Sequence, residues 1–197
     1  MYFCALNYNP IKMTMKKRMT LFAVAIVAIS MIACKSGNKT VESPQVEGHY
    51  TYEHAFNYDL MKSHLDVNET GTMDFSADGN ALDSARQVYT ATMEDGCKVT
   101  YVFNYVSPSR WRLDGTDFHF AGIKESFRME LIDSSTDNCD STRAAELAQE
   151  IIKVVSGSID YEYKFHLDTL TREKMQWSFT YRDGHSDTWE FFRKTRS

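Results

Sequence analysis

The sequence lacks the short motifs that mark many enzymes. It contains no Gly-x-Ser-x-Gly nucleophile elbow, no Cys-x-x-Cys, no Walker loop and no glycine-rich dinucleotide fingerprint. Its six histidines form no pair at i, i+4 or at i, i+2, so we expect no metal site of helix or strand spacing. These absences favour a non-enzymatic protein, although dispersed catalytic residues can still converge in a fold without any motif.

No hydrophobic run is long enough to span a membrane as a helix. The longest, Leu21 to Ala33, has 13 residues interrupted only by Ser30, whereas a spanning helix needs about 20 apolar residues. The run follows the basic cluster Lys16-Lys17-Arg18, which is typical of an export signal. Residues 1–14 have no counterpart in such a signal, so we expect them to be surplus, with Met15 as the better start.

The last residues of this run, Met31-Ile32-Ala33-Cys34, resemble the lipobox of bacterial lipoproteins, with Met31 where Leu is usual. The resemblance implies a signal peptide within residues 1–33, cleavage after Ala33, and attachment of acyl chains such as palmitate at Cys34. Together those chains would anchor the protein to a membrane, since a single acyl chain binds only marginally. Two alternatives stay open here: a plain secretory signal with an accidental cysteine, and an uncleaved anchor.

The residues after the cysteine form the only visible linker. Residues 34–46 are polar, include Pro44, and are expected to tether the next domain away from the bilayer. By resemblance to lipoproteins of two-membrane bacteria, Lys35 in place of Asp favours the outer membrane. Residues 35–39 carry no acidic cluster like that of surface-exported lipoproteins, so the periplasmic face is preferred over the cell surface.

Positive charge is scarce in the part that remains after cleavage. Residues 1–33 hold 4 basic residues and no acidic one, so the remaining 164 residues carry 18 Lys and Arg against 27 Asp and Glu, a net charge of −9. This argues against nucleic acid as a partner, because Lys and Arg contacts to phosphate supply that affinity. It also argues against electrostatic docking on anionic lipid. At this length we expect one domain, over residues 47–197.

From Gly48 onward, apolar and polar residues alternate repeatedly, which is the pattern of antiparallel strands with one buried face. Four Asp-Gly pairs, at 78–79, 95–96, 114–115 and 183–184, supply hairpin turns. None of the three prolines falls inside a run. We therefore predict a mainly β fold with strands at about 48–58, 69–76, 86–94, 98–106, 109–114, 117–122, 125–133, 158–168, 174–182 and 186–194.

One segment has helical spacing instead. Residues 142–155 place apolar side chains every three or four positions, with capping residues at 140–142 and Gly157 as a stop. This predicts one helix inserted before the last three strands. A weaker helical pattern, which includes Leu60, Met61 and Leu65, lies in the connection after the first strand. A meander this long avoids exposed edges best by closing into a barrel.

The layout resembles lipocalins over roughly residues 48–193. In that family a Gly-x-Trp opens the first strand, and an Arg near the last strand packs across the Trp. Here Gly48-His49-Tyr50 stands at the first position, with Tyr for Trp, and Arg193 closes the last run. The resemblance implies an antiparallel meander closed into a lipocalin-like (calycin-type) barrel, with Arg193 near Tyr50 as a structural contact at the closed end. Ten runs instead of eight, and the inserted helix, depart from the family's pattern.

Counting hairpins places four connections, 59–68, 95–97, 115–116 and 134–157, at one end of the barrel, which in lipocalins is the open mouth. The two helical segments would then form lids over it. Cys97 and Cys139 both fall at this end. In an oxidising compartment they either form a disulfide or remain two free thiols, and the sequence does not choose between these.

Aromatic residues dominate the positions that are expected to face inward. They either line a pocket for a small ligand or fill the barrel. We expect a non-enzymatic protein that binds a small hydrophobic or amphipathic ligand without cofactor or metal; the alternative is a cell-envelope interaction or assembly module with a filled barrel. An envelope hydrolase would instead need acid, base and nucleophile to converge at the mouth. The expected ligand-binding residues are Tyr101, Phe103, Tyr161, Tyr163, Phe165, Trp177 and Phe179.

Overall fold

The computed structural model describes residues 45–194 except 138, 160 and 182–183. The predicted signal peptide and Cys34 lie outside the described residues. In the described part the elements are β1 (Gly48–Leu60), β2 (Ser63–Phe75), β3 (Asn80–Met93), β4 (Lys98–Asp114), β5 (Asp117–Gly122), the 3-10 turn η1 (Lys124–Ser126), β6 (Arg128–Asp137), α1 (Ser141–Ser158), β7 (Glu162–Leu170), β8 (Lys174–Thr180) and β9 (Ser186–Arg193).

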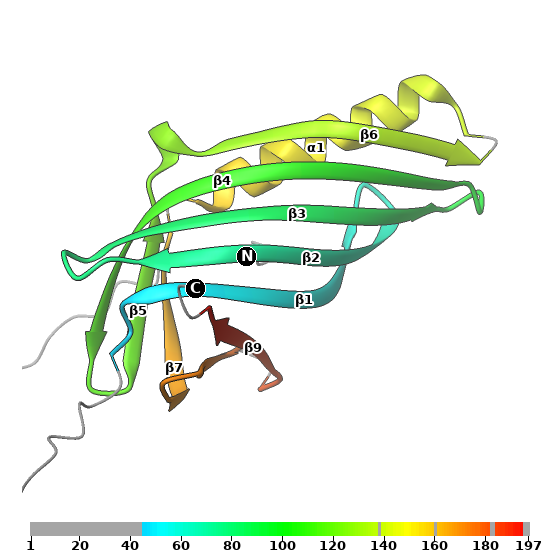
Figure 1. Ribbon diagram of the computed structural model, residues 1–197. Helices are drawn as coiled ribbons and strands as arrows, with labels where there is room; N and C mark the ends of the chain where they lie inside the picture. Colours follow the sequence, from blue (N-terminus) through cyan, green and yellow to red (C-terminus); the bar gives the residue numbers. More distant parts are fainter. Residues whose placement is uncertain (1–44, 138, 160, 182–183, 195–197) are drawn as a thin grey trace, which may run out of the picture. The chain divides into compact units, whose positions relative to one another are not determined.

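Eight of these strands close into an antiparallel barrel (Figure 1). Their order is β3-β2-β1-β9-β8-β7-β5-β4, and the pairing of β3 with β4 completes the ring. The remaining described strand, β6, pairs with the first half of β4, on the edge that β5 uses further along. The prediction of a mainly β fold, with a closed antiparallel barrel and one helix, is confirmed.

Strand β4 is a single long strand, so the prediction of two strands at 98–106 and 109–114 is wrong. Pro108 lies between these segments and inside β4, where it pairs with Leu82 of β3. Proline is tolerated there because β4 changes its partner from β6 to β5 at this point, which leaves no ladder partner for the missing N–H. The carbonyl of Pro108 still accepts a hydrogen bond from Ile123 N at 2.8 Å.

The merged strand also reverses part of the expected layout. The β3–β4 turn at 95–97 and the β4–β5 turn at 115–116 lie at opposite ends of the same strand. The prediction that four connections share one end of the barrel is therefore wrong. The error follows directly from counting β4 twice.

A tight turn replaces the second predicted helix. Met61 and Lys62 join β1 to β2 with φ angles of 48° and 61°, both in the left-handed region, which matches the twist of a two-residue hairpin. Strands β2 and β3 consequently begin near their turns, at Ser63 and Asn80, well before the predicted starts at 69 and 86. The alternation is hidden in these segments because polar residues occupy several of the inward positions.

The helix covers the inner face of the long strands. Figure 1 draws α1 alongside β6, and Tyr101 of β4 donates a hydrogen bond to the carbonyl of Ala144 in α1. Its buried residues are Ala144, Leu147, Ala148, Ile151, Val155 and Ser158. Among the described residues, no helix is long and apolar enough to cross a membrane.

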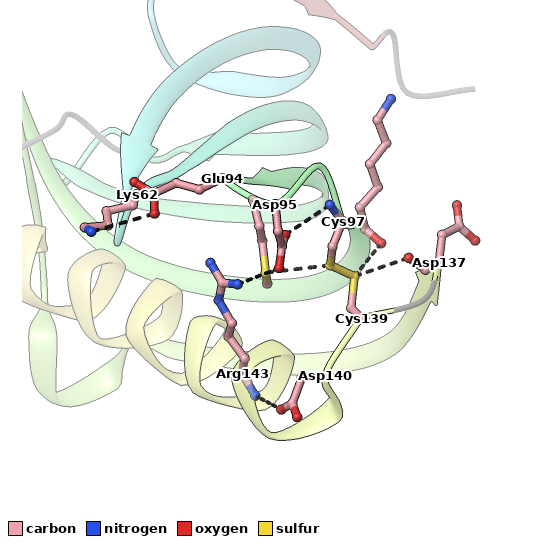
Figure 2. A network of polar contacts seen from close by, with 10 residues as sticks. Lys62, Glu94, Asp95, Cys97, Asp137, Cys139, Asp140 and Arg143 are labelled. Carbon is pink, nitrogen blue, oxygen red and sulfur yellow. Dashed lines mark hydrogen bonds and ion pairs between the residues drawn. A yellow bond between two sulfur atoms is a disulfide. The ribbon is translucent and has the colours of Figure 1, made fainter.

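A disulfide fixes the start of this helix (Figure 2). Cys97, after the β3–β4 turn, is bonded to Cys139, with their Cα atoms 5.5 Å apart. The side chain of Asp140 caps α1 by accepting a hydrogen bond from Arg143 N at 2.9 Å. The guanidinium of Arg143 in turn lies 2.8 Å from Asp95, in the same turn as Cys97. Covalent and ionic contacts therefore tie α1 to this end of the sheet.

Candidate functional site

The residues that the sequence predicts to bind a ligand separate into three groups. The first group, Tyr101 and Phe103, lies on β4 under α1 and is completely buried. The Tyr101 hydroxyl is 2.7 Å from the Ala144 carbonyl, and burial raises the pKa of Tyr101 to about 12. Tyr101 holds the helix on the sheet, and Phe103 packs beside it, with ring centroids 6.1 Å apart.

The second group, Phe165 and Trp177, fills the centre of the barrel. Their rings stack with centroids 5.0 Å apart, and Trp177 also packs against Phe118 at 4.6 Å and Phe191 at 4.4 Å. An eight-stranded barrel has an interior that side chains alone can fill. At this level the interior is packed with aromatic rings.

The third group lies nearer the ends of its strands. Tyr163 is half-buried and donates a hydrogen bond to the carbonyl of Ser158 at 3.0 Å, while Phe179 is half-buried on β8. Tyr161 is 53% exposed, so the expectation that it faces inward is wrong. The residue precedes β7, and the alternation of that strand does not extend to it.

A continuous series of aromatic rings lies on the inner side of the barrel where β1 and β9 are no longer paired. One branch runs along β1: the ring of His54 is 5.5 Å from that of Phe56, which is 6.3 Å from that of Tyr58. The His54 ring is also 4.5 Å from the ring of Trp189 on β9. We call this series the aromatic wall: His54, Phe56, Tyr58, Phe165, Phe179, Tyr181 and Trp189.

The second branch of the aromatic wall continues from Trp189 across β7 and β8. The rings of Trp189 and Phe165 are 5.7 Å apart, those of Phe165 and Phe179 are 5.8 Å apart, and those of Phe179 and Tyr181 are 5.0 Å apart. Four members, Phe56, Tyr58, Phe179 and Tyr181, are only partly buried. The wall therefore combines completely buried rings with rings that keep part of their surface accessible.

Strand pairing explains why the aromatic wall occurs at this place. Strand β1 pairs with β9 at three positions only, from Tyr50 with Arg193 to Tyr52 with Phe191. Beyond Tyr52, β1 continues to Leu60 with β2 as its partner. The backbones of β1 and β9 are not paired along this extension, and several of the inward-pointing rings there are only partly buried.

Next to the aromatic wall, two acidic residues are buried with three polar side chains that hydrogen bond to them or to one another. The Tyr52 hydroxyl lies 2.6 Å from a carboxylate oxygen of Glu69 and 2.7 Å from one of Asp83. The Tyr105 hydroxyl is 2.8 Å from Glu69 and 2.7 Å from Asp83, and Gln87 donates to Glu69 at 2.7 Å. We call these five residues the carboxyl–tyrosine cluster.

The cluster changes the acidity of its members. Burial, together with the nearby charge of Glu69, raises the pKa of Asp83 from 3.8 to about 6. Burial and the two carboxylates also raise the pKa of Tyr52 well above its usual value. A cavity of about 20 Å³ adjoins Asp83 and Tyr105, which is enough for one water molecule. The cluster can therefore hold and release a proton near pH 6.

The carboxyl–tyrosine cluster and the aromatic wall meet at one cross-strand pair of β1 and β2. Glu69 on β2 is the cross-strand partner of His54 on β1, so the carboxylate and the imidazole are neighbours on one face. Burial lowers the pKa of His54, which keeps its ring neutral at pH 7. The predicted site residues do not include Glu69 and Asp83, although each is in phase with inward apolar residues of its strand. That phase relation is the signal that could have identified them.

The residues behind the lipocalin comparison do meet in the structure. The guanidinium of Arg193 lies over the Tyr50 ring at 5.0 Å and donates to the Tyr50 hydroxyl. A Cβ on Gly48, whose φ is 153°, would lie 3.3 Å from Cζ of Arg193, so glycine leaves room for this stacking. All three residues lie at the short seam between β1 and β9.

Comparisons with known proteins add no family to this geometry. No family model matches the sequence, and no curated protein matches it. Within the described residues, no group of three or more His, Cys, Asp or Glu side chains is arranged to hold a metal ion.

Proposed function

We propose that this protein is a lipid-anchored extracytoplasmic lipoprotein whose lipocalin-like barrel binds a small hydrophobic or amphipathic ligand at the aromatic wall. The observation that carries the proposal is the series of half-buried rings of Phe56, Tyr58, Phe179 and Tyr181 beside completely buried ones. Ligand pockets are lined mainly by apolar and aromatic side chains with a few polar groups. His54, with the buried Glu69 as its cross-strand neighbour, is the polar group of this surface.

We place the proposed ligand site at other residues than those that the sequence predicts. Tyr101, Phe103, Phe165 and Trp177 are completely buried in packing contacts, so they support the site from behind. The contacting residues are instead the half-buried members of the aromatic wall. Phe179 is both a predicted ligand-binding residue and a half-buried member of the aromatic wall.

The proposed anchor rests on the lipobox-like residues before Cys34 and places the protein at a bacterial outer membrane, on its periplasmic face. The disulfide between Cys97 and Cys139 supports export, since structural disulfides persist in oxidising compartments. Metabolic labelling with palmitate tests this part. We expect label on the wild-type protein and none on Cys34→Ala; equal labelling of both proteins would contradict it.

Ligand binding is best tested without the acyl chains. The full chain carrying Cys34→Ala would be purified and mixed with fatty acids of several lengths and with haem, and bound species detected by native mass spectrometry. We expect a one-to-one complex with at least one probe. Phe56→Ala should weaken it about tenfold, because it removes a contacting ring. Ile132→Ala, at an exposed position on β6, is the matched control. No complex, or equal binding by both variants, would refute the proposal.

The packed centre of the barrel supports a second candidate function. The stacking of Phe165 and Trp177 leaves the interior filled at their level, as expected for a cell-envelope interaction or assembly module. Cross-linking in intact cells followed by pull-down separates the two functions. A stoichiometric protein partner that is retained by Phe56→Ala, with no small-molecule complex, would favour the assembly role.

A further inference from the structure

The outer face of the barrel carries a groove that is separate from the aromatic wall on the inner face. It has a volume of about 1020 Å³ and crosses five neighbouring strands, β9, β1, β2, β3 and β4. Small-molecule sites are typically a few hundred to about 1,000 Å³, so its size suits a ligand. The strands that form it can be followed side by side in Figure 1.

The strand register arranges the lining of this groove in two parallel rows. The first row is Glu53, Thr70, Arg86 and Asn104, each opposite the next across a strand pair. The second row begins at Phe192 of β9 and ends at Val106 of β4, and its middle members are Thr51, Thr72 and Ser84. Strands lie about 4.8 Å apart, so the second row is roughly 19 Å long.

The hollow is built by packing on the opposite side of the sheet. A Cβ on Gly71 would lie 2.7 Å from the ring of Tyr52, so this glycine lets the ring pack directly on the backbone of β2. The Tyr52 hydroxyl is held there by Glu69 and Asp83. The carboxyl–tyrosine cluster thus connects β1, β2 and β3 by side-chain hydrogen bonds beneath the groove.

The first row offers planar polar groups for recognition. In the described part of the chain, Glu53, Arg86 and Asn104 make no side-chain hydrogen bond or ion pair with another residue. A carboxylate, a guanidinium and an amide each present paired acceptors or donors in one plane. Such groups match adjacent hydroxyls on a ligand, which both donate and accept.

The second row offers a floor of small hydroxyl-bearing side chains with an apolar group at each end. Phe192 is 52% exposed and Val106 is 40% exposed. Charge in the groove is close to balanced, because Glu53 stands against Arg86 and Glu190 is paired with Lys174. The lining therefore suits an elongated, uncharged, hydroxyl-rich molecule that also has an apolar face.

We propose that this groove binds a linear neutral oligosaccharide. The hydroxyls of successive sugar rings would hydrogen bond to the first row, and the C–H face of a terminal ring would pack on Phe192. An acidic ligand would meet Glu53 as well as Arg86 and gain no net attraction, and an acyl chain would strip water from the hydroxyl floor without replacing its hydrogen bonds. Over the centre of the groove an added peptide strand has no edge to pair with, since β2 and β3 have partners on both sides. The edge of β1 beyond Tyr52 has no β9 partner, so the test below includes an extended peptide.

The test is isothermal titration calorimetry of the full chain carrying Cys34→Ala. The probes are fragments of α-glucan, β-glucan, xylan and chitin, together with a polyuronate and an unrelated extended peptide. We expect one neutral oligosaccharide class to bind, with its dissociation constant raised about tenfold by Arg86→Ala and by Phe192→Ala. Ile132→Ala should leave it unchanged, as should Phe56→Ala on the opposite face.

Both groove variants change exposed side chains, so circular dichroism and a thermal melt should match the wild-type protein. Binding of no neutral oligosaccharide would overturn the proposal. Tighter binding of the polyuronate or the peptide would also overturn it, as would binding that survives both groove variants. Because Phe56→Ala affects only the aromatic wall, failure here is distinguishable from failure of the ligand site proposed inside the barrel.

Discussion

The guanidinium of Arg193 lies over the ring of Tyr50, with Cζ 5.0 Å from the ring centroid. The same side chain donates to the Tyr50 hydroxyl and to the carbonyl of Gln45. Tyr50 hydroxyl in turn lies 2.9 Å from the carbonyl of Val46, which is buried. Because β1 and β9 pair at only three positions, these side-chain contacts supply much of what closes the barrel at this seam.

Removing the Arg193 side chain should therefore weaken the closed barrel. We expect Arg193→Ala to lower the free energy of unfolding by about 1–3 kcal/mol, since it removes a cation–π contact and charge-assisted hydrogen bonds. Urea denaturation measures this. Arg193→Lys should recover only part of the loss, because lysine cannot stack a planar group on the ring. Arg172→Ala, at an exposed position between β7 and β8, is the control, and an equal loss there would contradict the prediction.

The sequence predicts the closed barrel well because alternation and turn residues depend on local chemistry alone. It predicts strand length poorly wherever that chemistry is unusual. Glu69 and Asp83 occupy inward positions and break the apolar alternation, yet they are buried in a hydrogen-bonded network. Met61 and Lys62 form a left-handed turn without the Gly or Asn that normally marks one. Both features are favourable only because of the strands that pair beside them, and a local sequence pattern does not show those partners.

The site is predictable to a similar, limited degree. Alternation identifies correctly that Phe165 and Phe179 face inward, but it cannot separate the completely buried ring from the half-buried one. That difference depends on where the pairing of β1 with β9 stops, an offset that no local pattern records. Phe56 and Tyr58 are on the parity expected to be inward, yet their place in a ligand surface emerges only from this offset.

The disulfide should contribute substantially to stability. Cys97 and Cys139 are 42 residues apart, and closing a loop of this length restricts the unfolded chain by about 3–4 kcal/mol. We expect the Cys97→Ser, Cys139→Ser double variant to lose this amount in urea denaturation. Reducing agent should destabilise the wild-type protein similarly and leave the variant unaffected. A wild-type protein that is insensitive to reductant, with Cys97 and Cys139 both labelled by a thiol reagent after unfolding without reductant, would contradict the prediction.

The raised pKa of Asp83 predicts that its contribution to the stability of the fold decreases as the pH rises. The folded protein holds its proton up to about pH 6, whereas the unfolded chain releases it near 3.8, so protonation favours the fold. This contribution is complete below about pH 4 and is lost as the pH rises through 6. Its size is on the order of 3 kcal/mol.

The variant Asp83→Asn isolates this contribution, because an amide does not titrate. Melting temperatures between pH 4 and 7 should fall less steeply with pH in Asp83→Asn than in the wild-type protein. Asp133→Asn, at an exposed position on β6, controls for the loss of one negative charge. Parallel pH profiles for wild type and Asp83→Asn would rule out Asp83 as the titrating group.

The close approach of Gly71 to Tyr52 gives the sharpest test of packing. In Gly71→Ala the new methyl group would lie 2.7 Å from the ring, and the ring cannot move away while its hydroxyl is bonded to Glu69 and Asp83. We expect a loss of about 1–3 kcal/mol in the free energy of unfolding. Gly157→Ala is the matched control, because a Cβ there meets no atom within 4 Å, and alanine in a helix should stabilise by up to about 1 kcal/mol.

A double-mutant cycle separates the steric effect from a general intolerance of the strand. Tyr52→Leu removes both the ring and its hydrogen bonds, so adding Gly71→Ala to it should cost far less than adding it to the wild-type protein. The expected coupling is about 1–2 kcal/mol, within the range for residues in direct contact. Additive losses would mean that the backbone of β2, and not the Tyr52 ring, requires glycine at this position. The outer groove would then need another origin than the packing of Tyr52 beneath it.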